Sequence, residues 1–178
     1  MAAWSWSEAM RCVRLPALVA VLPLALGSCS TTHRLTAAIV DGRLAFLADG
    51  NWWSRPDCFY SIDVSTDEGS PAAPEPGDDT DRVASGTYWF YWRNECANEY
   101  PVYYGQPLKG APYRREDGRE WGHVAPKPLS PHVVYSASTL SPGSSYGTAY
   151  FRLDGRGNVE NLTWEEVQAQ ATPLPASS

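Results

Sequence analysis

The sequence predicts an all-β fold: a single antiparallel β-sandwich with a short C-terminal helix. Several short segments alternate between apolar and polar residues, which is typical of strands with one buried face. Turn signals rich in glycine, proline and aspartate separate these segments. The sequence also has no apolar pattern of helical period long enough for an α/β fold. We therefore expect the sandwich over residues 35–162 and the helix within residues 163–178.

The N-terminal segment is typical of a secretory signal. Arg11 and Arg14 precede an apolar run over residues 15–26, and small residues follow it. The run is too short to cross a bilayer, for which about 20 apolar residues are needed. Met10, directly before the cations, is an alternative start of the chain. We expect residues 1–28 to be removed as a signal peptide.

The last four residues of this segment, Leu-Gly-Ser-Cys, resemble the bacterial lipobox. In that motif the thiol of the cysteine is acylated and the chain is cut just before it. The resemblance implies a lipid on Cys29, a polar tether over residues 29–34 and attachment to a membrane of the bacterial cell envelope. The residue after the cysteine is Ser30 and not aspartate. This resembles lipoproteins that are passed on to the outer membrane, and the resemblance implies a protein that faces the periplasm.

The mature chain is acidic. The full sequence carries a formal charge of −6, and the signal holds two arginines and one glutamate, so 12 cations face 19 acids afterwards, or −7. An acidic chain repels nucleic acid and anionic lipid headgroups. We therefore expect no nucleic-acid partner and a membrane attachment that depends on acyl chains.

The cysteines indicate the same compartment. Cys12 leaves with the signal and Cys29 would carry lipid, so Cys58 and Cys96 remain. In an oxidising compartment such a pair usually forms a disulfide, which would stabilise the fold by about 4 kcal/mol. The alternatives are a two-ligand metal site or a catalytic thiol, but the chain has only three histidines to complete either.

Residues 35–40 and 43–48 predict two strands of a hairpin. Asp41-Gly42 joins them, and this pair suits a type I′ turn because both central residues need positive φ. The loop over residues 51–57 follows and carries Trp52 and Trp53. These two side chains either cap the end of the core or form a platform for a ligand.

Residues 58–65 predict a half-buried strand that pairs antiparallel with the aromatic segment 86–93. If the disulfide sets the register, Ile62 faces Trp92 and Val64 faces Phe90. A bulge after this segment would shift the pairing by one residue. In the unshifted register Trp89, Tyr91 and Tyr103 lie on the face opposite the core. Either loops and the C-terminal helix cover that face, or it is an aromatic surface that stacks on sugar rings or a partner.

The connection over residues 66–85 predicts a flexible, solvated loop. It contains six acids and one cation, with three prolines and two glycines. The run of residues 78–81, Asp-Asp-Thr-Asp, lacks the glycine turn and the distal glutamate of a calcium loop. We therefore expect no metal there.

Residues 100–105 predict a short strand and residues 109–122 a polar loop. Beyond them Leu129, Pro131 and Tyr135 match the pattern Leu-x-Pro-x-x-x-Tyr. This pattern resembles the tyrosine corner of immunoglobulin-like and fibronectin type III-like sandwiches, and the resemblance implies that the tyrosine hydroxyl bonds backbone a few residues upstream.

The C-terminal part predicts strands over residues 146–153 and 158–162, joined by a glycine turn. Thr163 and Glu166 form a capping box that opens a helix through Ala171, and a tail ends the chain.

No residue pattern indicates catalysis. Residues 143–147 fit G-x-S-x-G, but a strand follows the serine where the motif needs a helix, and no histidine follows His132. The spacing of His123 and His132 does not match a metal site. Three acids of the polar loop give no sign of a cleft for glycoside hydrolysis; they are Glu116, Asp117 and Glu120. We therefore expect neither an enzyme nor a cofactor.

The whole chain resembles small bacterial lipoproteins with a cysteine-linked β domain, and we expect a non-catalytic binding or interaction module of the cell envelope. The first alternative is a binder of glycan or peptidoglycan fragments, because six tryptophans and ten tyrosines remain in the mature chain. Its candidate ligand-binding residues are Trp52, Trp53, Trp89 and Trp121. A second alternative is a resemblance to lysozyme-inhibitor lipoproteins, which present a serine and a basic side chain. The turn over residues 141–150 has the serines but no lysine.

Overall fold

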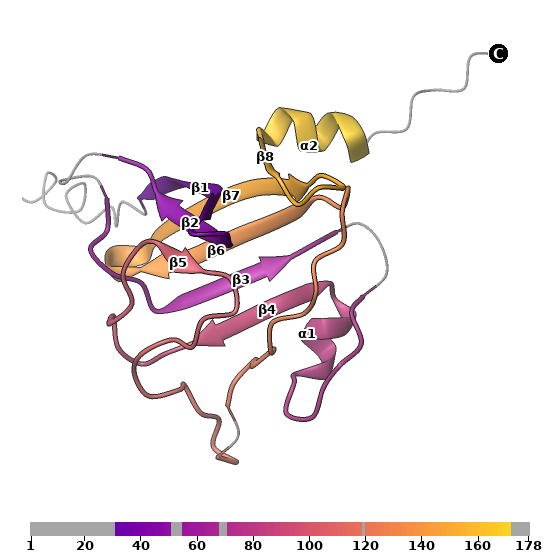
Figure 1. The fold of residues 1–178 in the computed structure, drawn as a ribbon. Helices are drawn as coiled ribbons and strands as arrows, with labels where there is room; N and C mark the ends of the chain where they lie inside the picture. The colour runs from indigo at the N-terminus through magenta and orange to yellow at the C-terminus, as the bar shows by residue number, and fades with distance from the viewer. Residues whose placement is uncertain (1–30, 51–54, 68–70, 119, 172–178) are drawn as a thin grey trace, which may run out of the picture.

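The structure is a computed structural model that describes residues 31–50, 55–67, 71–118 and 120–171. Within these residues it consists of one mixed β-sheet, strongly curled into a half-barrel (Figure 1). The strands are β1 (Thr32–Val40), β2 (Arg43–Ala48), β3 (Ser61–Ser65), β4 (Thr87–Trp92), β5 (Val102–Tyr103), β6 (Tyr135–Ser141), β7 (Ser145–Leu153) and β8 (Val159–Leu162). The helices are α1 (Thr80–Ala84), the short 3-10 helix η2 (Pro142–Ser144) and α2 (Trp164–Ala171).

The predicted antiparallel sandwich is wrong, because the strands form one continuous sheet and one of its pairings is parallel. The order across the sheet is β4-β3-β6-β7-β1-β2-β5, and β8 pairs with β7 beside this path. The start of β1 runs parallel to β7, and the rest of β1 runs antiparallel to β2. Strand β1 therefore joins two groups of strands that a sandwich would keep in separate sheets.

The junction depends on a longer first strand than the sequence indicated. Strand β1 begins at Thr32, so it takes in residues 32–34, which were assigned to the tether. Where β1 leaves β7, the side-chain amide of Asn161 binds the backbone of β1. The amide accepts a hydrogen bond from the Ala37 N–H and donates one to the Ala37 carbonyl, both at 2.8 Å. One side chain thus supplies the two hydrogen bonds that a neighbouring strand would otherwise make.

Several local predictions are confirmed. The first hairpin has the predicted register around Asp41-Gly42, and both turn residues have positive φ, 50° and 73°. The capping box at the start of α2 is formed, since the Thr163 N–H donates to Glu166 Oε2 at 2.7 Å and the Glu166 N–H donates to Thr163 Oγ1 at 3.3 Å.

The tyrosine corner is formed locally but does not specify a sandwich. The Ser130 N–H donates to the hydroxyl of Tyr135 at 2.9 Å, as the pattern implies. Tyr135 is fully buried and its ring packs on Phe151 of the adjacent strand. The same hydrogen bond therefore stabilises the backbone just before strand β6, here in a curled sheet.

Strands β3 and β4 pair as predicted, but one residue out of the predicted register. Ile62 lies opposite Tyr91 and Val64 opposite Trp89. The backbone leaves the ladder after Trp92, and the next bridge joins Phe59 to Asn98. The disulfide therefore lies beyond this departure and does not continue the register of the strands.

This shift moves Trp89 into the core, where none of its surface is exposed, instead of onto the opposite face. The main core lies on the inner, concave side of the sheet and contains Trp89, Phe46, Phe59, Ile62, Tyr135 and Phe151, among others. A second, smaller core lies on the other side of β4 and contains Val83, Phe90 and Val124.

In its described residues, 66–67 and 71–85, the acidic segment differs from the predicted solvated loop. It contains helix α1, whose N-cap Asp79 accepts a hydrogen bond from the Arg82 N–H at 3.3 Å. Val83 of this helix is buried in the smaller core. Neither helix α1 nor α2 in the described part of the chain has the length and apolarity that a membrane span requires.

Candidate ligand-binding groove

A groove with three aromatic side chains among its six lining residues lies at the end of β4, on the outer side of the sheet. Its cavity volume is about 620 Å³. The lining residues, which we call the aromatic groove, are Trp92, Tyr113, Arg114, Arg115, Glu116 and Trp121.

Backbone hydrogen bonds bring the three rings of the groove together. The Tyr113 N–H donates to the Trp92 carbonyl at 3.2 Å, and the Trp121 N–H donates to the Tyr113 carbonyl at 2.8 Å. The ring centroids of Trp92 and Trp121 are 5.3 Å apart, and Tyr113 lies 6.2 Å from each of them. Three residues separated in sequence thus become neighbours on a backbone ladder.

The rings of the groove remain open to solvent. Tyr113 is 47% exposed, whereas Trp92 and Trp121 are half-buried. A set of aromatic rings that is open on one side and supported on the other is typical of a surface that binds a ligand with an apolar face.

Arg82 of helix α1 supports the groove from below. Its guanidinium carbon lies 3.7 Å from the ring centre of Phe90 and 4.7 Å from that of Trp121. The same guanidinium pairs with Asp63 of β3 at 3.3 Å. Burial raises the pKa of Asp63, and the charge of Arg82 opposes that rise. Arg82 therefore holds helix α1 against the back of the groove, because its guanidinium both stacks on the rings and pairs with Asp63.

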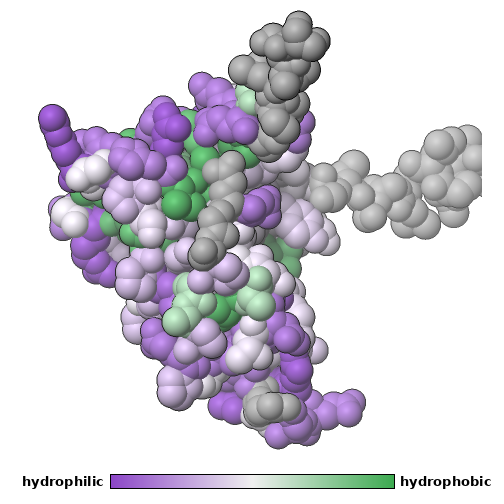
Figure 2. All heavy atoms as spheres, turned by 90° about the vertical axis from the view of Figure 1, so that its right-hand side faces the viewer, coloured by the Kyte–Doolittle hydropathy of each residue, from purple (hydrophilic) through white to green (hydrophobic). Residues whose placement is uncertain are grey.

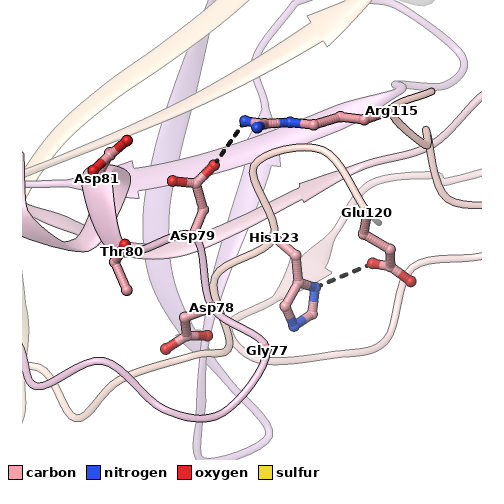
Figure 3. Close-up of a pocket in the computed structure, with 8 residues that line it drawn as sticks. All are labelled: Gly77, Asp78, Asp79, Thr80, Asp81, Arg115, Glu120 and His123. Carbon is pink, nitrogen blue, oxygen red and sulfur yellow. Dashed lines mark hydrogen bonds and ion pairs between the residues drawn. The ribbon is translucent and has the colours of Figure 1, made fainter. Parts of the chain in front are cut away.

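A second, acidic pocket adjoins the aromatic groove and shares Arg115 with it (Figure 3). Its volume is about 610 Å³, and it is lined by Gly77, Asp78, Asp79, Thr80, Asp81, Arg115, Glu120 and His123. Arg115 pairs with Asp79 at 3.4 Å, and His123 Nδ1 lies 3.2 Å from Glu120. The imidazole of His123 also stacks on Tyr91, with the ring centres 4.9 Å apart.

One lining residue of the acidic pocket, Asp78, forms a buried ion pair with Lys127. The side chain of Asp78 has no exposed surface and that of Lys127 is 2% exposed, with 2.5 Å between their charged atoms. Asp78 also accepts from the backbone N–H groups of Glu75 and Ala125. Burial alone would raise the pKa of Asp78. The hydrogen bonds from Lys127, Ala125 and Glu75 outweigh the burial and keep that pKa below its ordinary value. The pair therefore fastens the acidic segment to residues 125–127.

Three of the four carboxylates of the acidic pocket, those of Asp78, Asp79 and Glu120, pair with cations of the protein itself. Glu120 also lies 3.6 Å from Arg93, and Asp79 is held by Arg115. Within the described residues no group of three or more histidine, cysteine or acidic side chains is arranged to hold a metal. The arrangement favours positioning of the adjoining loops over acid–base chemistry.

The predicted site residues separate into three groups. Trp121 lies in the aromatic groove, whereas Trp89 lies in the core and cannot meet a ligand at the surface. Trp52, Trp53 and Cys29 lie outside the described residues. Cys58 and Cys96 form the predicted disulfide, with their Cα atoms 5.4 Å apart. This bond indicates a location outside the cytoplasm.

The sequence alone did not single out Trp92, Tyr113 or Arg114. Trp92 was assigned to the core face by the unshifted register, and the others were assigned to a polar loop.

The serine of the G-x-S-x-G stretch does meet a histidine, which precedes it in the chain. His33 Nδ1 lies 3.2 Å from Ser145 Oγ, and His33 Nε2 lies 3.4 Å from the hydroxyl of Tyr100. However, Ser145 is buried and begins strand β7 directly, so it lacks the strand-to-helix turn that the motif needs. Ser141 and Ser145 are both buried, so neither is presented as an inhibitor's serine would be.

A further hollow of about 850 Å³ lies between helix α2 and the outer sides of β6 and β7. Val134, Trp164 and Val167 are among the residues that line it. The face of the molecule on the right of Figure 1 is mostly hydrophilic, with hydrophobic side chains at the surface in small areas (Figure 2). The aromatic groove is distinguished from this hollow by its three adjoining rings and its charged rim.

Comparisons with known proteins do not add a family to this geometry. No protein-family model, curated protein or solved structure matches the chain.

Proposed function

We propose that the protein is a lipid-anchored binding module of the bacterial cell envelope and that its aromatic groove binds carbohydrate. The lipobox-like segment ending at Cys29 supports the anchor and an outer-membrane position facing the periplasm. The disulfide supports the compartment. The module performs no reaction: it holds a glycan of the envelope, with peptidoglycan chains as the first candidate.

The observation that carries this proposal is the set of three rings around one cavity with charged groups at its rim. The electron-rich faces of Trp92, Tyr113 and Trp121 suit the weakly positive C–H faces of a sugar ring. Arg114 and Glu116 lie at the same cavity and offer a hydrogen-bond donor and an acceptor for hydroxyl groups. A few polar groups around an apolar surface are the usual composition of a small-ligand site.

The test is calorimetric titration of the mature protein with soluble peptidoglycan glycan fragments and with neutral oligosaccharides. We expect binding by at least one class and an affinity about fivefold lower for Trp92→Ala and for Trp121→Ala, since a stacked ring contributes on the order of 1 kcal/mol. Trp164→Ala is the matched control, because this tryptophan is 52% exposed but lies on α2. Absence of binding to every glycan, or equal weakening by Trp164→Ala, would reject the groove as the site.

A further inference from the structure

The turn between β6 and β7 belongs to the longest uncharged part of the mature chain. Residues 133–151 contain no aspartate, glutamate, lysine, arginine or histidine. The rest of this acidic protein would be repelled by anionic headgroups and would lose hydration of its charges at a membrane surface. This turn carries no charge, so it can approach a lipid surface without electrostatic repulsion and without loss of charge hydration.

The same turn lies beside the point where the folded domain begins. The Tyr146 N–H donates to the Thr31 carbonyl at 3.0 Å, and Thr32 pairs with Tyr146 in the parallel ladder. His33 holds Ser145 through their side chains at 3.2 Å. A Cβ on Gly147 would lie 2.2 Å from His33 Nε2, so only glycine leaves room for this imidazole. The start of β1 and the turn are therefore hydrogen-bonded and closely packed against each other.

The chain between the lipidation site and the start of β1 is short. Only Ser30 and Thr31 separate Cys29 from strand β1. Three peptide steps reach about 10 Å, even when fully extended. An acyl chain on Cys29 would therefore hold the start of β1, and the turn beside it, close to the headgroups.

One side chain of the turn is suited to that environment. Tyr146 is 48% exposed, and tyrosine rings are enriched at membrane–water interfaces because one end is apolar and the other polar. Arg34, which pairs with Thr148 in the parallel ladder, lies 3.9 Å from Asp49, so these two charges compensate each other. The surface around the attachment point thus combines an exposed phenol with near-neutral charge.

We propose that the turn Pro142–Tyr146 rests in the headgroup region of the bilayer, with Tyr146 as its interfacial contact, and so orients the domain. This inference rests on the lipid anchor of the proposed function. Strand β4, which ends at the aromatic groove, is four places from β1 in the sheet order and lies well apart from it in the fold (Figure 1), so we expect the groove to stay clear of the lipid.

The test uses the acylated mature protein in phosphatidylcholine–phosphatidylethanolamine vesicles, with mass spectrometry of Cys29 before each measurement. A nitroxide is attached to Tyr146→Cys or, as the matched control, to Tyr113→Cys, which replaces a tyrosine of nearly equal exposure, 47% against 48%. Electron paramagnetic resonance then compares the access of oxygen and of a water-soluble nickel chelate to each label. The Cys29→Ser protein mixed with the same vesicles gives the aqueous reference.

We expect nickel access at position 146 to fall several-fold below the aqueous reference and access at position 113 to stay at it. A label at the exposed Thr32 checks the result independently of any effect of replacing Tyr146, and it should be shielded too. Full nickel access at 146 and 32 in protein with acylated Cys29 would overturn the orientation alone. Cys29 without an acyl group would overturn both the orientation and the anchor.

Discussion

The two faces of strand β4 carry the same kind of residue and use it differently. On the inner face Trp89 is fully buried, with its ring 5.3 Å from that of Tyr104. On the outer face Phe90 is covered by the smaller core, whereas Trp92 stays half-buried at the edge of the aromatic groove. The outer face is therefore neither wholly covered nor wholly an aromatic surface: its middle is covered and its end is open. Alternate residues of one strand thus lie in the core on one side and, at Trp92, line the groove proposed to bind a ligand on the other.

The largest expected effect is on the inner face. Trp89→Ala removes a fully buried indole and leaves a cavity, so we expect the free energy of unfolding to fall by about 3–5 kcal/mol. Trp92→Ala should cost less, about 1–2 kcal/mol, because its ring is only partly buried. Urea unfolding of both variants measures the difference. Equal losses would mean that the two faces do not differ in the way described.

The next effect concerns the cover of the outer face. Lys127→Ala leaves the carboxylate of Asp78 buried without its partner, and we expect a loss of about 3 kcal/mol. Glu75→Gln removes the other, exposed partner of Lys127 and should cost less than about 1 kcal/mol. Because the hydrogen bonds keep the pKa of Asp78 below its ordinary value, its stabilisation is present above that value and is lost as the pH falls through the lowered pKa. Thermal unfolding at pH 7 and pH 3 tests both points, and an unaffected Lys127→Ala protein would contradict them.

A smaller effect is expected where the cover meets the groove. Arg82→Lys keeps the charge next to Asp63 but loses the planar stacking on Phe90 and Trp121. We expect a loss of about 1 kcal/mol in stability, together with weaker glycan binding because Trp121 is less firmly supported. Calorimetry and urea unfolding of the same variant separate the two effects. Unchanged glycan affinity would show that Arg82 supports the fold but not the groove.

The smallest effect is expected at the far end of the sheet. Burial lowers the pKa of His33, so the fold favours the neutral imidazole. Its contribution is present above the unfolded pKa of about 6.5 and is lost as the pH falls towards the lowered folded value. The described groups in contact with the ring, Ser145 and Tyr100, are uncharged and do not compensate the imidazolium. The wild-type protein should therefore lose more stability than His33→Gln between pH 7.5 and pH 5, as measured by urea unfolding; parallel losses would contradict this.

Local patterns predicted much of this molecule because they depend on neighbouring residues. Asp41-Gly42 specified a turn, and Thr163 and Glu166 specified a helix start, through interactions within a few residues. The tyrosine corner was predicted on the same basis, and its hydrogen bond spans only five residues. Such a local bond does not determine which sheet its strand will join. The presence of the tyrosine corner at Tyr135 therefore did not justify the prediction of a sandwich.

The features that were missed depend on contacts between distant parts of the chain. The parallel pairing of β1 with β7 joins residues 32–34 to residues 146–148, and no local pattern signals it. The register of β4 depends on how the backbone leaves the ladder after Trp92, and an error of one residue exchanges the two faces of a strand. Because of that error, Trp92 was placed on the core face and Trp89 was named as a candidate ligand-binding residue. Arg82 appeared to be a lone cation in an acidic loop, because its aromatic partners lie elsewhere in the sequence.

The disulfide between Cys58 and Cys96 encloses β3, the acidic segment and β4 in a single covalent loop. A protease that cuts the backbone once inside this loop cannot release either piece, because both remain joined through sulfur. A nicked molecule would migrate as a full-length chain in non-reducing electrophoresis and separate into fragments only after reduction. The half that contains β1 and the half that carries the aromatic groove would thus stay joined after a cut in the most acidic stretch of the chain.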